Sequence, residues 1–288
     1  MKTVAAIVAT ATVMVVLIVV NAPPPDGAGN KDAGPAVPIR TVFTMLEAEN
    51  DVAREIWAND IVRIGQERGL RFDKDWHDEG LDAGPLPALF LRELAESMRR
   101  TRVPLYLFLG SDRPINDANL FIGPQTDHFA ALKRTGQPQF FTDPELGFHT
   151  AMFSDVAITE SCVVCHNEDP DSPKKDWRVG DIMGATTWSY PEGEVGAATA
   201  LMLLGTLRHG IREAYQHYLD KVATFADPPP VGDRWPADGY YLPSVDTFLS
   251  RVEQRASANS VSLLLKAQGL DRPAETGQGL DRPTETGH

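Results

Sequence analysis

The sequence predicts an α+β fold in which a small antiparallel sheet is flanked by long helices. Two observations point to it: apolar residues recur at spacings of three and four over long segments, and short apolar runs are separated by turn-rich segments. A third is size, because 288 residues with 42% hydrophobic and 23% charged residues suffice for one core of moderate size plus appendages. We therefore expect one globular domain rather than two.

Three long segments show helical periodicity. Apolar residues share one face over residues 41–66, 86–100 and 195–221. Pro85 and Pro87 stand at the start of the second segment, where a missing N–H group costs little. These segments are the predicted helical layers of the domain.

Short apolar runs predict strands over residues 103–109, 148–158 and 181–190. The connections are two turns, one short helix and one polar loop, at residues 110–117, 143–147, 127–134 and 167–178 respectively. Strands joined by such short connections favour antiparallel pairing.

The N-terminal segment is apolar and uncharged over residues 4–20. It is just long enough to span a bilayer, and we predict an uncleaved anchor over residues 1–22; a cleaved signal peptide is the alternative. Lys2 precedes the segment and no other cation follows before Lys31, so the body is expected outside the cytoplasmic membrane. Residues 23–40, rich in Pro and Gly, read as a tether.

The C-terminal part is expected to extend beyond the core. Residues 227–267 are predicted to form a helical extension, with one helix over residues 245–268 lying outside the domain. Residues 268–288 carry two copies of a polar decamer that differ at one position, and we predict that they are disordered. Tandem duplication of a tail explains the repeat most simply, and a partner-binding peptide is the alternative.

The strongest functional signal is the stretch Cys162-Val163-Val164-Cys165-His166, which has the spacing of a c-type haem attachment site. Each thiol adds to one vinyl group of the porphyrin, and the adjacent imidazole is then placed to bind the iron. The motif predicts one covalent haem c, with Cys162 and Cys165 as the attachment sites and His166 as the iron ligand.

Three other readings of the two cysteines are a redox dithiol, half of a zinc site and a structural disulfide. A structural zinc site usually needs four Cys or His ligands, and the chain has only these two cysteines. A redox CxxC usually opens a helix after a strand, and the flanks here look loop-like.

Charge and composition exclude other classes of function. The net charge of −13 argues against a nucleic-acid partner, which would require clustered Lys and Arg. No Ser/His/Asp or paired-carboxylate arrangement stands out, so we expect an electron carrier or sensor rather than an enzyme.

Several blocks resemble one known family: PALFLRELAE at residues 87–96, LGSDRPIN at 109–116, CVVCHN at 162–167 and DSPKKDW at 171–177, followed by Gly180-Asp181. Over residues 41–221 the chain resembles the bacterial single-haem c-type sensor domain, which is also found as a free cyanobacterial cytochrome. The resemblance implies a PAS-like haem domain over residues 41–226, outside the cytoplasm, with one haem.

The chain departs from that family in two ways. No second apolar segment follows residue 221, whereas sensor members usually continue through a second membrane helix into a signalling module. A cysteine is the other axial ligand in the free cytochrome, and none remains here. Met98 and Met152 are the first candidates for the sixth ligand, although methionines on apolar faces are usually core residues.

Lys174, Lys175 and Trp177 follow the motif closely. They are placed to face the haem propionates or the ring edge, or to form a solvated loop.

We therefore expect a membrane-anchored monohaem cytochrome on the periplasmic side of a bacterial cytoplasmic membrane. Its expected role is that of an electron-transfer or accessory subunit of a membrane redox complex, such as a photosynthetic reaction centre. The alternatives are a redox or gas sensor that signals through a separate protein and a structural subunit whose haem is vestigial.

Overall fold

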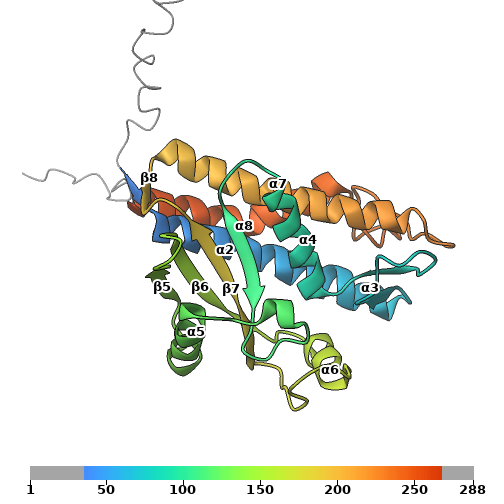
Figure 1. Ribbon diagram of the computed structural model, residues 1–288. Coiled ribbons are helices and arrows are strands. Elements are labelled where there is room, and N and C mark those ends of the chain that lie inside the picture. The colour runs from blue at the N-terminus through green and yellow to red at the C-terminus, as the bar shows by residue number, and fades with distance from the viewer. Residues whose placement is uncertain (1–35, 268–288) are drawn as a thin grey trace, which may run out of the picture.

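A computed structural model describes residues 36–267 (Figure 1). The predicted anchor, most of the predicted tether and the decamer repeat lie outside these residues. The elements are β1 (Val37–Pro38), α2 (Ile39–Ile56), the π-helical η1 (Trp57–Arg63), α3 (Ile64–Glu67), β2 (Arg71–Asp73), β3 (Ala83–Pro85), α4 (Pro87–Arg99), β4 (Tyr106–Gly110), the 3-10 helix η2 (Asp117–Asn119), α5 (Pro124–Thr135), β5 (Gln139–Thr142), β6 (His149–Val156), α6 (Glu160–Glu168), β7 (Ile182–Tyr190), β8 (Glu194–Val195), α7 (Ala197–Val222) and α8 (Val245–Ala267).

The main sheet has four antiparallel strands in the order β4-β7-β6-β5, which confirms the predicted α+β class with a small antiparallel sheet. The three predicted strands correspond to β4, β6 and β7. Strand β5 was not predicted. It has only four residues, and its extended conformation depends on pairing with β6. The first strand begins at Tyr106 rather than at residue 103.

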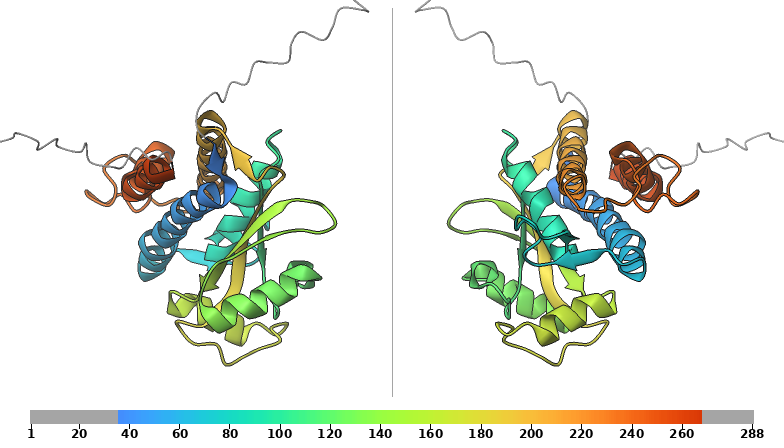
Figure 2. Two further views of the ribbon diagram at one scale, coloured as in Figure 1. Left: turned by 90° about the vertical axis from the view of Figure 1, so that its left-hand side faces the viewer. Right: turned by 90° about the vertical axis from the view of Figure 1, so that its right-hand side faces the viewer.

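Successive side chains of the strands point to opposite faces, and each face has its own core. Leu107, Ala151 and Trp188 pack with the long helices. Phe108 and Met152 instead join Phe121, Phe129 and Leu132 beneath α5. Figure 2 shows the long helices at one end of the molecule and the short helices α5 and α6 at the other.

Trp57 is the centre of the helical core. Its ring stacks on Phe90 with centroids 4.4 Å apart and meets Tyr218 edge-on at 5.0 Å. These residues come from η1, α4 and α7, so the three predicted helical segments meet at one aromatic cluster. Aromatic pairs of this kind contribute roughly 0.5–1.5 kcal/mol beyond the burial of their area.

Helix α8 does not lie outside the domain, contrary to the expectation. Phe248, Leu249 and Val252 are buried in the same core as α2 and α7. The Phe248 ring stacks on Tyr215 at 4.2 Å, and the Tyr215 hydroxyl donates a hydrogen bond to the carbonyl of Pro243 just before α8. Packing therefore places α8 in the core of the domain.

The end of the predicted tether also belongs to the domain. Val37 and Pro38 form β1, which pairs with β8, and α2 already begins at Ile39. Val37 and Ile39 are buried, so their side chains contribute to the core. Within residues 36–267, no helix combines the length and the apolar character needed to cross a membrane.

Candidate functional site

The CxxCH motif lies on helix α6, which follows β6 after three residues, so the motif does lie on a helix after a strand, contrary to the expectation, whereas the segment after α6 is a loop as predicted. Glu160 in the first turn suits the helix dipole. Cys162, Cys165 and His166 stand at positions i, i+3 and i+4, which share one face of a helix. The helix therefore presents all three side chains in one direction.

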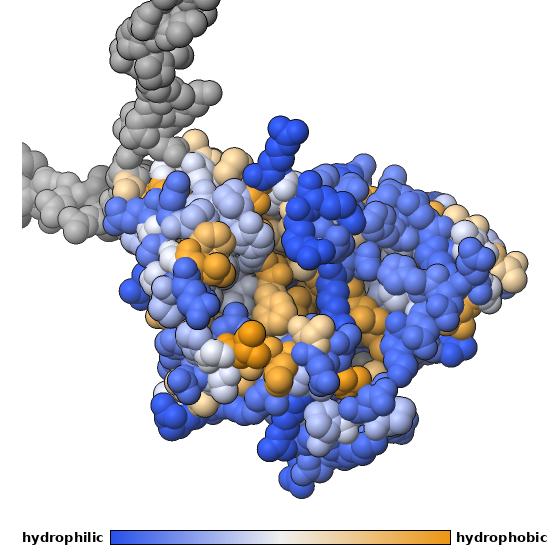
Figure 3. All heavy atoms as spheres, in the orientation of Figure 1, coloured by the Kyte–Doolittle hydropathy of each residue, from blue (hydrophilic) through white to orange (hydrophobic). Residues whose placement is uncertain are grey.

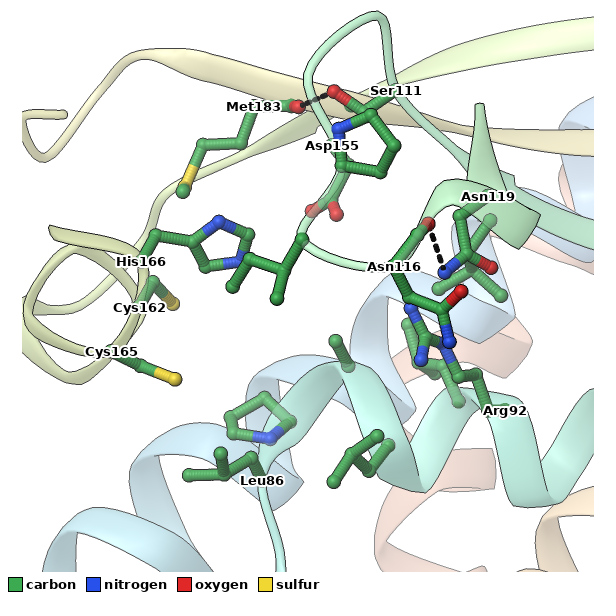
Figure 4. Close-up of a pocket in the computed structure, with 18 of the residues that line it drawn as sticks. Leu86, Arg92, Ser111, Asn116, Asn119, Asp155, Cys162, Cys165, His166 and Met183 are labelled. Atoms are coloured by element: carbon green, nitrogen blue, oxygen red, sulfur yellow. Dashed lines mark hydrogen bonds between the residues drawn. The ribbon is translucent and has the colours of Figure 1, made fainter. Parts of the chain in front are cut away.

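That face of α6 forms one wall of a cavity of about 860 Å³. The other walls are the start of α4, the loop between β4 and η2, and the ends of β6 and β7 (Figure 4). Figure 3 shows apolar side chains gathered in a hollow on the face of the molecule seen in Figure 1. Leu86, Leu89 and Leu91 line the α4 side. The volume lies within the range of sites for small molecules and cofactors.

The imidazole of His166 points from α6 into this cavity (Figure 4). Burial lowers its pKa, and the carboxylates of Asp155 and Asp169 only partly oppose that effect. The ring is therefore neutral at neutral pH, which is the state that binds a metal. Its Nδ1 atom is buried and has no hydrogen-bond partner in the part of the chain that the structure describes.

The two thiols are not joined by a disulfide, and both line the cavity. Cys162 Sγ lies 3.2 Å from the hydroxyl of Thr159. Burial raises the pKa of Cys165. Reactive dithiols have a lowered thiol pKa, so this environment disfavours the redox-dithiol reading even though the motif does lie on a helix after a strand.

Asn167 connects the motif helix to the following loop. Its side-chain amide donates to the carbonyl of Trp177 at 3.0 Å and accepts from the N–H group of the same residue at 2.8 Å. Trp177 is thereby placed edge-on to His166, with ring centroids 6.4 Å apart. The loop thus supports the wall of the cavity from behind.

Lys174, Lys175 and Trp177 do not line the cavity, contrary to one of the two expectations for them. The Lys174 ammonium lies 4.0 Å from the centre of the Trp177 ring and 2.8 Å from Asp176. Lys175 donates a hydrogen bond to the carbonyl of Asp169. Both lysines therefore contact residues of their own loop rather than the cavity, and the sequence did not indicate this.

Neither Met98 nor Met152 reaches the cavity. Met98 is buried between α4 and α7, and Met152 is buried beneath α5 on the opposite face of the sheet. Met183 on β7 does line the cavity, but it packs with Val163 and Cys162 on the same wall as His166 (Figure 4). Both methionines proposed from the sequence are therefore core residues.

Three cations line the cavity, and sequence reasoning missed all of them. Arg54 pairs with Asp155, and the Lys74 ammonium lies 2.9 Å from Asp169. Among the described residues, no ion pair or hydrogen bond is found for the guanidinium of Arg92 on α4, and burial lowers its pKa. No sequence motif identifies these residues as cavity residues, because Arg54, Lys74 and Arg92 come from separate segments of the chain.

The arrangement fits a covalently bound haem c on three counts. The two thiols and the imidazole converge on one cavity, the imidazole is neutral, and the facing wall carries the apolar side chains of Leu86, Leu89 and Leu91. Arg92, for which no charge partner is found within residues 36–267, offers a positive charge to the carboxylates of such a group. Residues 36–267 contain no group of three or more His, Cys, Asp and Glu side chains that could hold a bare metal ion.

Comparison with known proteins gives one match. The model of a family described as Tll0287-like matches residues 37–191, which is more than half of the chain and includes α4, the loop after β4 and the motif helix. No curated protein and no solved structure matches the chain.

Proposed function

Because the chain belongs to the Tll0287-like family, which comprises bacterial c-type cytochrome-like domains, we propose that it carries one haem c bound to Cys162 and Cys165. His166 is the proposed iron ligand. The observation that carries the proposal is the convergence of both sulfurs and the imidazole on one cavity of about 860 Å³. A PAS-like fold is part of the proposal, and the four-stranded antiparallel sheet supports it.

When bound, haem c supplies one-electron redox chemistry. The chain's own residues do the rest. Leu86, Leu89 and Leu91 would exclude water from one side of the cavity, and Arg92 would hold the carboxylates of the haem. The hydrogen bonds between Asn167 and Trp177, and the edge-on contact of Trp177 with His166, help to hold the imidazole in its orientation.

We further propose that the domain is tethered by residues 4–20 outside the cytoplasmic membrane and acts in electron transfer as a subunit of a membrane redox complex. The uncharged N-terminal segment and the acidic surface, with a net charge of −13, support a protein with membrane and protein partners. Gentle solubilisation from its own membrane and identification of co-purifying redox proteins test this role.

The first prediction is that the full chain, produced in a bacterium with c-type maturation machinery, retains a red pigment after denaturation. Covalent thioether bonds survive denaturing electrophoresis, whereas noncovalent haem is lost. Haem staining of the gel measures the pigment. Its absence, with the chain present at the correct mass, would refute haem attachment.

A sensor is the second candidate, and one observation favours it. On the cavity walls away from α6, the lining residues in the described part of the chain contribute no histidine, and Met183 packs on the side of α6. A gas sensor needs a position on the iron that is open or easily displaced, whereas a carrier benefits from two protein ligands.

The second prediction separates these roles with carbon monoxide. If the domain is a sensor, the ferrous spectrum shifts rapidly and completely when the gas is added, because nothing from the facing wall must be displaced. If it is an electron carrier, the six-coordinate spectrum stays unchanged. Stopped-flow absorption of the reduced full chain makes the measurement.

A further inference from the structure

Helix α2 carries a carboxyl group in the core that the proposed function does not use. The Glu47 side chain is 5% exposed, and it accepts a hydrogen bond of 2.6 Å from Trp188 Nε1 on β7. A buried carboxyl group is costly to ionise unless a positive charge lies close. The protonation state of Glu47 therefore depends on the charges that lie near it.

Glu47 is connected to the cavity through charged groups. Arg54 follows it by two turns on α2, about 10 Å along the axis. Arg54 pairs with Asp155 on β6, and both side chains line the cavity wall. Asp51 lies one turn after Glu47, 3.6 Å from Arg54, and its side chain is half exposed. The charges of Arg54 and Asp155 on the cavity wall therefore affect the pKa of Glu47. Asp51, which is half exposed, offers a route by which protons from solvent reach Glu47.

The electrostatic setting keeps Glu47 near the point of ionisation. Burial, followed by the charge of Asp51, raises its pKa to about 8, while the Trp188 hydrogen bond and Arg54 oppose the rise. The negative charge of Asp155 on β6 also raises the pKa of Glu47. The other buried carboxylate of α2, Glu49, is paired with Arg208 on α7, which also contacts Glu253 on α8.

We propose that Glu47 binds a proton when a haem in the cavity is reduced, so that electron transfer to this domain is coupled to proton uptake. The inference rests on the proposed function. In balanced form, one electron from a one-electron donor converts ferric to ferrous iron, and one proton from solvent converts the Glu47 carboxylate to the acid. The added negative charge is thereby neutralised inside the protein.

The test is the midpoint potential of the full, pigmented chain as a function of pH. Because the reduced form binds the proton more tightly, the potential falls as pH rises, over about two pH units on either side of 8. One proton per electron sets the steepest slope at about 59 mV for each tenfold change in proton concentration. Glu47→Gln, which keeps the acceptor for Trp188, is expected to remove this slope.

Glu49→Gln is the matched control, because it also replaces a buried carboxyl group on α2 but one away from the cavity. It is expected to retain the slope. The inference is overturned if Glu47→Gln retains the wild-type slope, or if Glu49→Gln alone removes it.

Infrared difference spectra between the two oxidation states supply a second readout. At a pH near 8, a protonated carboxyl band is expected to appear on reduction in the wild type and to be lost in Glu47→Gln; a band unchanged in that variant would also overturn the inference. A chain without covalent pigment would refute the proposed function instead, whereas a pigmented chain with a pH-independent potential refutes only the role of Glu47.

Discussion

Replacing both cysteines in a Cys162→Ala, Cys165→Ala variant is expected to abolish all pigment that survives denaturation. The two sulfurs line the same cavity as the imidazole of His166, and the chain contains no other cysteine. Each single variant keeps one thioether site and is expected to retain a reduced yield of covalent pigment. Haem staining against total protein measures the loss, and a double variant that still stained would contradict the assignment.

His166→Ala distinguishes attachment from ligation in the same experiment. It leaves both thiols in place, so covalent pigment is expected to remain while the absorption spectrum and the potential change, because the axial ligand is lost. The matched control is His128→Ala. His128 is on α5, stacked on Phe141, and does not line the cavity. Its replacement is expected to leave the spectrum unchanged.

Phe248→Ala is expected to lower the free energy of unfolding by about 3–5 kcal/mol, as is typical of a buried Phe replaced by Ala. Phe248 is fully buried on α8, where it stacks on Tyr215 and meets Phe90 edge-on at 6.0 Å. Urea unfolding of the full chain, followed by tryptophan fluorescence, measures the change.

Leu201→Ala is the control for that variant. Leu201 is also an apolar helical residue, but 57% of its surface is exposed, so the expected change is within about 0.5 kcal/mol. If Phe248→Ala is too unstable to purify, Phe248→Leu is expected to lower the free energy of unfolding by a smaller amount. Equal stability of Phe248→Ala and the wild type would show that α8 is not part of the cooperative core.

The family match ends at residue 191, yet the core does not. Tyr215 and Tyr218 on α7 and Phe248 on α8 complete the aromatic cluster around Trp57. The part of the domain that holds the cavity is therefore supported by helices beyond the matched region. A shortened chain ending near residue 191 would expose the apolar faces of α2 and α4.

Local patterns in the sequence are sufficient to predict much of the fold and the most specific part of the site. The spacing of Cys162, Cys165 and His166 places them on one side of any short helix, so their convergence needs no distant contact. Helices over 41–66 and 86–100 were equally predictable, since helical periodicity depends only on near neighbours. The structure confirms these helices as continuous or nearly so.

The rest depends on contacts between residues far apart in the chain. Met98 and Met152 each have a sulfur atom that could bind iron, but the helix and the strand that carry them bury their side chains in two separate hydrophobic cores. The sequence around Arg92 and Glu47 does not predict their roles. Arg92 lines a cavity that several segments form together, and Glu47 is buried by segments distant in the chain. Whether α8 lies on the domain or beyond it was likewise decided by packing, since an amphipathic helix does not encode which surface will cover its apolar face.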